Sequence, residues 1–138
     1  MPETESITPP TPKQIRNLLS FLPQIANPAE PFHTCDVKNS PFDPYTYSPL
    51  VDRFIQALEI NGFCQPFDWP SWHNQAEAYM KDPSKLGNAD IETIIKLFTI
   101  ILRKERFCSG TIAAFLDNGF ILTLLKRLGE IEKEISSE

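Results

Sequence analysis

Cysteine is scarce in this chain of 138 residues, and its pattern does not fit a disulfide scaffold. The three cysteines, Cys35, Cys64 and Cys108, form an odd set without the dense, even spacing of small secreted domains. Apolar runs are also short, because none approaches the roughly 20 residues that a membrane-spanning helix needs. The opening residues, MPETESITPPTP, are acidic and rich in proline, whereas a secretory signal is basic and then apolar. We therefore expect reduced thiols, a cytoplasmic location and no membrane partner.

Positive charge is in the minority, which argues against general affinity for nucleic acid or anionic membranes. The 13 Lys and Arg residues are outnumbered by 18 Asp and Glu residues, and the formal net charge is -5. Residues 96–127 are the exception, with six cationic side chains and two acidic ones. This basic segment supports a weak nucleic-acid binder only as an alternative, since a solvated helix face has the same composition.

Hydrophobic residues make up 41% of the chain, which is enough for one domain with a core. A first helix is predicted from Thr11, with Pro12 at its first position and Gln14 completing a capping box, and Pro23 ends it. Six prolines from Pro23 to Pro49 exclude a regular helix or a central strand, and they predict an extended strap. The apolar anchors of this strap would be Phe32, Phe42, Tyr45 and Tyr47.

Capping residues and helical spacing mark the elements that follow the strap. Ser48 with Pro49 predicts a helix start, and the triplet Asn-Gly-Phe at 61–63 predicts a left-handed cap at its end. The same triplet at 118–120 predicts a second cap of this kind.

In the second half of the chain, a helix is predicted to start at Pro70, and three more helices are predicted to follow it. Residues 81–88 are predicted to form a loop, and Asn88 or Asp90 would cap a long core helix. Ser109 would cap a short helix, and a last amphipathic helix would follow. The apolar stripe of the core helix comprises Ile91, Ile94, Ile95, Phe98, Ile101 and Leu102, extended by Leu97 and Ile100.

These elements predict an all-α fold, a single-domain bundle of about five or six helices with a Pro-rich, irregular N-terminal strap. Residues 1–10 would be a mobile tail, and residues 11–49 a short helix plus the strap. Residues 50–131 would form the helical core domain, and residues 132–138 a charged tail.

Cys108 has the one local environment here that could activate a side chain. It precedes a predicted helix start and follows Arg103, Lys104 and Arg106, and these features favour a thiolate. With His73 as the base it would form a Cys-His nucleophile. A lone cysteine is more commonly a small apolar residue packed between helices. We therefore assign no catalytic residue and keep Cys108 and His73 as candidates.

The same turn is a candidate anion-binding site. The backbone amides of Ser109, Gly110 and Thr111 point along the predicted helix start, with Arg106 close by. Asp68 belongs to the same predicted ligand-binding set. Alternatively, Arg106 pairs with Asp68 and leaves no vacancy for a ligand.

Trp69 and Trp72 complete the ligand-binding set, because their rings could stack on a base or another ring, with core packing as the competing interpretation. His33, Cys35 and Asp36 have the chemistry of metal ligands but lack the paired spacing of a zinc site, so no metal is predicted. The sequence has no Gly-rich phosphate loop and no serine nucleophile elbow, and we predict no cofactor.

Several motifs occur in a fixed order between Leu50 and Ile131. They are Asn-Gly-Phe at 61–63, Phe-Asp-Trp at 67–69 with Trp72, the helix opening at 90–93, Arg-Phe-Cys-Ser-Gly at 106–110, and Gly119 through Leu125 to Arg127-Leu128. In this set the chain resembles a family of small bacterial proteins known only as a domain of unknown function. The resemblance implies an all-helical domain and supplies no reaction, ligand or catalytic residue. The N-terminal third, through the strap, lies outside the resemblance.

The function predicted on this basis is a non-enzymatic binding or regulatory module whose partner is an unknown protein or a small anionic ligand. The enzyme alternative is a thiol-dependent or anion-substrate activity at Cys108 and Arg106. A deep pocket joining these two residues with His73 and Trp69 would favour the enzyme, and a filled turn would favour the module. A homodimer is a further expectation, from the apolar surface that both long helices must bury.

Overall fold

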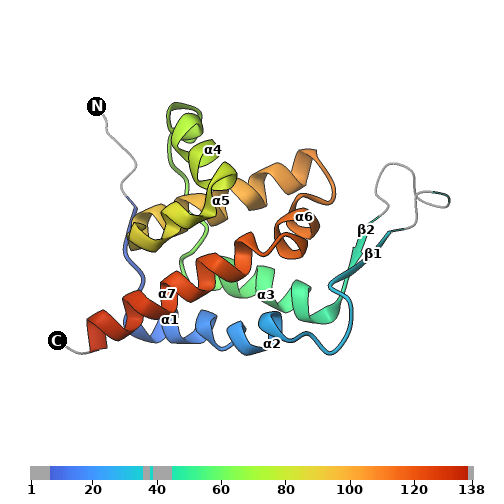
Figure 1. The fold of residues 1–138 in the computed structure, drawn as a ribbon, viewed down its shortest axis with the longest axis horizontal. Coiled ribbons are helices and arrows are strands. Elements are labelled where there is room, and N and C mark those ends of the chain that lie inside the picture. The colour runs from blue at the N-terminus through green and yellow to red at the C-terminus, as the bar shows by residue number, and fades with distance from the viewer. Residues whose placement is uncertain (1–6, 36–37, 39–44, 137–138) are drawn as a thin grey trace.

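The computed structural model describes residues 7–35, 38 and 45–136, and this part of the chain is mainly α-helical (Figure 1). The elements in chain order are α1 (Pro12–Leu19), α2 (Leu22–Ala26), β1 (His33–Cys35), β2 (Tyr45–Tyr47), α3 (Pro49–Ile60), η1 (Pro70–Trp72), α4 (His73–Lys81), η2 (Pro83–Asn88), α5 (Ile91–Phe107), α6 (Thr111–Asp117) and α7 (Phe120–Ser136). The predicted all-α class and helical bundle are therefore confirmed. No helix in the described ranges is both long and apolar enough to cross a membrane.

Three of the helix starts predicted from capping residues, at Thr11, Ser48 and Asp90, are confirmed. The Thr11 hydroxyl accepts from the Gln14 amide at 3.2 Å, and the Gln14 side chain accepts from the Thr11 amide at 2.8 Å, which completes the capping box of α1. Ser48 caps α3. Of the two candidates for α5, Asp90 is the cap, and its carboxylate accepts from the Thr93 amide at 2.8 Å.

The core is built around α5, as its wide apolar stripe predicts. The Phe98 ring meets Phe54 of α3 and Phe63 edge-on, with ring centroids 6.1 and 6.2 Å apart. Truncating such a buried ring costs about 3–5 kcal/mol, so this cluster fixes α5 against α3. In Figure 1, α7 crosses the body between α5 and α1, and it packs against both. The buried residues of α5 are Ile94, Ile95, Leu97, Phe98, Thr99, Ile100, Ile101 and Leu102.

Both Asn-Gly-Phe triplets turn the chain at a glycine with positive φ, as predicted. Gly62 has φ +83°, and the Phe63 amide donates to the Leu58 carbonyl at 2.9 Å, the bond of a Schellman cap. Gly119 has φ +84°, but the chain enters α7 at once, so the second triplet is a corner between two helices.

The first predicted helix is two helices, because it does not run to Pro23. α1 ends at Leu19, and α2 starts at Leu22 with Pro23 in its first turn. A proline has no amide to donate and fits the first turn of a new helix better than the last turn of an old one. This break accounts for seven α-helices in the described ranges, against the five or six predicted.

The Pro-rich strap contains a short antiparallel hairpin that the sequence did not reveal. His33 pairs with Tyr47, Thr34 with Thr46 and Cys35 with Tyr45. The prolines flank the paired residues and do not interrupt them, so the backbone bonds of the hairpin can form. Asp36 and Phe42, named in the sequence interpretation, lie outside the described residues.

Three boundaries also differ from the prediction. Within the predicted tail, Ile7 packs on the core and the Gln65 side chain makes two hydrogen bonds to the Thr8 backbone, at 2.8 and 2.7 Å. The predicted loop at 81–88 is mostly the turn η2. The last helix continues to Ser136.

Candidate binding surface

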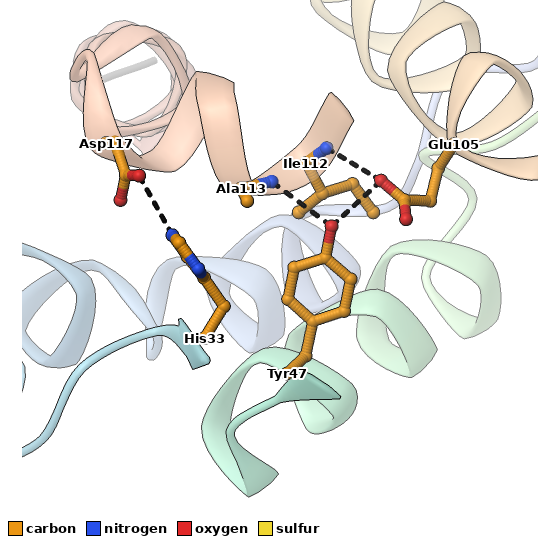
Figure 2. Close-up of polar contacts among 6 residues, drawn as sticks. All are labelled: His33, Tyr47, Glu105, Ile112, Ala113 and Asp117. Atoms are coloured by element: carbon orange, nitrogen blue, oxygen red, sulfur yellow. Dashed lines mark hydrogen bonds and ion pairs between the residues drawn. The ribbon is translucent and has the colours of Figure 1, made fainter. Parts of the chain in front are cut away.

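The strap hairpin is bonded to the turn between α5 and α6 through Tyr47. Figure 2 shows its hydroxyl between the Glu105 carboxylate and the first turn of α6. The hydroxyl donates to Glu105 Oε1 at 2.9 Å and accepts from the Ala113 amide at 3.2 Å. Burial raises the pKa of Tyr47 above its ordinary value, and the hydrogen bond to Glu105 raises it further. The phenol therefore stays protonated and serves as donor and acceptor at once.

Glu105 occupies the start of α6 as an internal anion. Its Oε1 accepts from the Ile112 amide at 2.8 Å, and its Oε2 accepts from the Gly110 amide at 3.2 Å. The helix cap is Gly110 and not Ser109 as predicted, because the Glu105 carboxylate satisfies the amides that a serine cap would serve. Two of the α6 amides that an external anion would use are thus already bonded.

A second contact joins the hairpin to the other end of α6. The His33 Nε2 lies 2.8 Å from the Asp117 carboxylate (Figure 2). The His33 ring also meets Tyr45 and Tyr47 edge-on, so it packs between the hairpin and the helix. The sequence interpretation considered His33 only as a metal ligand, and the structure places it in this contact.

A narrow cleft lies between the start of α4 and the last two turns of α5. Its volume is about 60 Å³. The α5 residues in it follow the spacing i, i+3, i+4, i+7 and therefore share one face of the helix. The lining residues are Trp69, His73, Ile100, Arg103, Lys104 and Phe107.

An open groove of about 460 Å³ lies on the other side of Phe107, toward α6. Lys104 and Phe107 line both hollows, so the two are adjacent. We call the combined area the Phe107 surface. The groove is lined by Lys104, Phe107, Cys108, Ser109, Gly110, Thr111, Ala114 and Phe115.

Phe107 is the feature that sequence reasoning missed. Its exposed fraction is 90%, and that of Trp69 across the cleft is 39%. A phenylalanine is normally buried, and a large exposed apolar group is an informative exception. The available signal was that Phe107 lies outside the apolar stripe of α5 and directly follows the cationic residues Arg103, Lys104 and Arg106.

Only some of the predicted site residues lie on the Phe107 surface in the structure. Neither hollow is lined by Arg106, Asp68 or Trp72. In the described ranges Arg106 makes no ion pair with Asp68, so the predicted structural pairing is not formed. The predicted site residues that do line the Phe107 surface are Trp69, His73, Cys108, Ser109, Gly110 and Thr111.

The two candidate catalytic residues face different hollows. His73 lines the cleft, and its Nε2 lies 3.2 Å from the Glu77 carboxylate. Cys108 is exposed and lines the groove, where its carbonyl accepts from the Thr111 hydroxyl at 2.7 Å. Phe107 lies in both hollows and so stands between them. Neither hollow joins the four residues that the enzyme alternative requires.

Trp72 and two cations of the basic segment have partners within the fold. The Trp72 ring stacks on Tyr79, and the Lys96 ammonium lies 5.3 Å from the Trp72 centroid, a cation–π distance. Lys96 also pairs with Glu92, and the Arg127 guanidinium donates to the Ala89 carbonyl. These groups are therefore engaged away from the Phe107 surface.

Comparison with known proteins gives a family and no activity. The model of a family described as a family of unknown function (DUF6508) matches residues 10–134. This range includes α1 and the strap, so the family extends over the N-terminal third that the sequence interpretation had left outside it. No curated protein and no solved structure matches the chain.

Proposed function

We propose that this chain, which belongs to the family of unknown function DUF6508, is a non-enzymatic binding module that captures a segment of another protein on its Phe107 surface. The observation that carries the proposal is the exposure of Phe107 beside Trp69. An aromatic residue left outside the core contributes little to folding, and such residues are enriched in protein interfaces.

The distribution of reactive groups supports a module over an enzyme. An activated nucleophile needs a base within about 2.6–3.2 Å, and His73 and Cys108 line separate hollows. Two backbone amides at the start of α6, those of Gly110 and Ile112, are already bonded to Glu105.

Selection from a phage-displayed library of random linear peptides tests the proposal. The folded wild-type protein is the bait, and the enriched peptides are then measured against Phe107→Ser. The control is Ile60→Ser, which removes an apolar side chain of 76% exposure at the end of α3, outside the Phe107 surface. We expect peptides that bind wild type and Ile60→Ser equally, and Phe107→Ser at least about tenfold more weakly. A selection that yields no Phe107-dependent peptide would contradict the proposal.

A further inference from the structure

We infer that the segment captured on the Phe107 surface is acidic and carries one bulky apolar anchor residue that enters the cleft between Trp69 and Phe107. The inference rests on the proposed function and adds the chemistry of the partner. Its two parts, the anchor and the acidic flanks, come from separate observations.

The anchor follows from the size and lining of the cleft. A volume of about 60 Å³ is far below the roughly 300–1,000 Å³ of sites that take whole small molecules. Ile100 is 4% exposed, and Trp69 and Phe107 add aromatic surface to the cleft. An apolar cleft of this size suits one aliphatic or aromatic side chain, which is how a peptide is anchored to a protein surface.

The acidic flanks follow from three cations at the end of α5. Arg103 and Lys104 line the cleft, and Arg106 lies one turn beyond Arg103. No carboxylate in the described ranges forms an ion pair with any of the three. Their positive potential is therefore available to attract an acidic segment and orient it.

Glu105, the one acidic residue among 103–106, forms no ion pair with this cluster in the described ranges. Residues one or two positions apart do not face each other on a helix, so Glu105 is not placed to pair with the three cations. Here its carboxylate is turned to Tyr47 and to the amides of Gly110 and Ile112. The Glu105 carboxylate is therefore used within the fold and is not a partner of the three cations.

A separate protein fits this surface better than a second copy of the chain. The most acidic helical stretch of the chain is the end of α7, and its carboxylates already have partners. Glu130 and Glu134 pair with Arg127, at 3.0 and 3.6 Å, and Glu132 pairs with Arg16 at 3.7 Å. Docking that stretch on another copy would require these pairs to open or to be shared.

The test measures binding of the selected, Phe107-dependent peptides by isothermal titration calorimetry at two salt concentrations. Each peptide is compared with a version in which Asp and Glu are replaced by Asn and Gln. The protein variant is Arg103→Gln/Lys104→Gln. Its matched control, Lys126→Gln/Lys133→Gln, removes two exposed charges from α7.

We expect the charge-free peptides to bind wild type about tenfold more weakly, and the Arg103/Lys104 variant to lose about the same factor for the acidic peptides. The two losses should not add when combined, because they remove the two sides of one interaction. Added salt should weaken the wild-type complex, and the α7 control should behave as wild type.

Several results would overturn the inference. Phe107-dependent peptides that are neutral, or whose binding ignores salt, would remove the acidic partner and leave the proposed function standing. Absence of any Phe107-dependent peptide would remove the proposed function itself. A concentration-dependent dimer that Phe107→Ser dissociates would make a second copy the occupant. Phe107-dependent binding of a single-stranded oligonucleotide would replace the peptide with nucleic acid.

Discussion

The Tyr47 hydroxyl donates to the Glu105 carboxylate at 2.9 Å across 58 positions of the sequence. This bond connects the strap to the end of the core helix. Because Glu105 also accepts from two amides at the start of α6, one carboxylate holds three elements together. Beside Phe107, Arg103 and Lys104 form no ion pair within the described part of the chain.

Replacing Tyr47 with phenylalanine should destabilise the protein by about 1–3 kcal/mol. The Ala113 amide loses its acceptor, and Glu105 loses the only neutral side-chain donor that it has in the described ranges. Chemical denaturation measures the effect. Tyr79→Phe is the control, because the Tyr79 hydroxyl makes no hydrogen bond within the described part of the chain. Equal stability of the two variants would show that the strap contact does not contribute.

Gly110→Ala should be the most damaging of three glycine substitutions. Gly110 has φ +94°, and an added Cβ would lie closer than 3.0 Å to three atoms of the Tyr45 ring. Gly119→Ala should lose only about 1–2 kcal/mol of stability, because a side chain at its φ of +84° strains the backbone. It adds no clash, since nothing lies within 4 Å of the added carbon. Gly87→Ala has neither problem and should be near neutral. The order of melting temperatures tests this, and a Gly110→Ala protein as stable as Gly119→Ala would contradict the packing of Tyr45.

The cap of α5 should contribute stability that depends on pH. The Thr93 side chain and backbone donate hydrogen bonds to Asp90 and lower its pKa in the folded state. A lowered pKa means that the stabilisation is full above the unfolded-state value of about 3.9 and is lost as the pH falls through the folded-state value. Asp90→Ala should therefore lose about 1 kcal/mol at neutral pH, with the difference from wild type shrinking in acid.

Ser48→Ala is the control for this pH dependence. The substitution removes the Ser48 hydroxyl that caps α3, and this hydroxyl does not titrate. The loss of stability in Ser48→Ala should therefore not change between neutral and acidic pH. Urea denaturation across the acidic range measures both variants. A constant difference between wild type and Asp90→Ala would contradict the ionic role of the cap.

Phe107→Ser should leave the stability of the fold within about 0.5 kcal/mol of wild type, because its side chain is 90% exposed. Phe98→Ala, in the centre of the same helix and fully buried, should lose about 3–5 kcal/mol. Thermal unfolding compares the two. A large loss for Phe107→Ser would assign Phe107 to the fold and not to a surface reserved for binding.

The helices were predictable because their signals are local. The capping box at Thr11 and Gln14, the proline after Ser48 and the glycine at 62 each act within one turn of backbone. The stripe of α5 was wide enough to predict burial on several sides. The hairpin was not predictable, since three paired residues per strand give too short a pattern and their stability depends on contacts with α6.

The candidate surface was only partly predictable. Residues 106–111 were singled out from the chemistry of a helix start, and most of them line the groove. The role of Glu105 was not visible, because its partners Tyr47 and Ile112 lie on other elements of the fold. The exposure of Phe107 was not predicted, because a phenylalanine is ordinarily buried and only the tertiary structure shows that no element covers this one.

The sequence by itself determined the helical class, most helix ends and the core face of α5, because these depend on spacing and on capping groups a few residues apart. Only the tertiary structure decided which side chains remained outside. The Glu105 carboxylate accepts from amides at the start of α6, and packing of the strap places the Tyr47 hydroxyl where it donates to the same carboxylate. That placement is non-local, because Tyr47 and Glu105 lie 58 positions apart in the sequence.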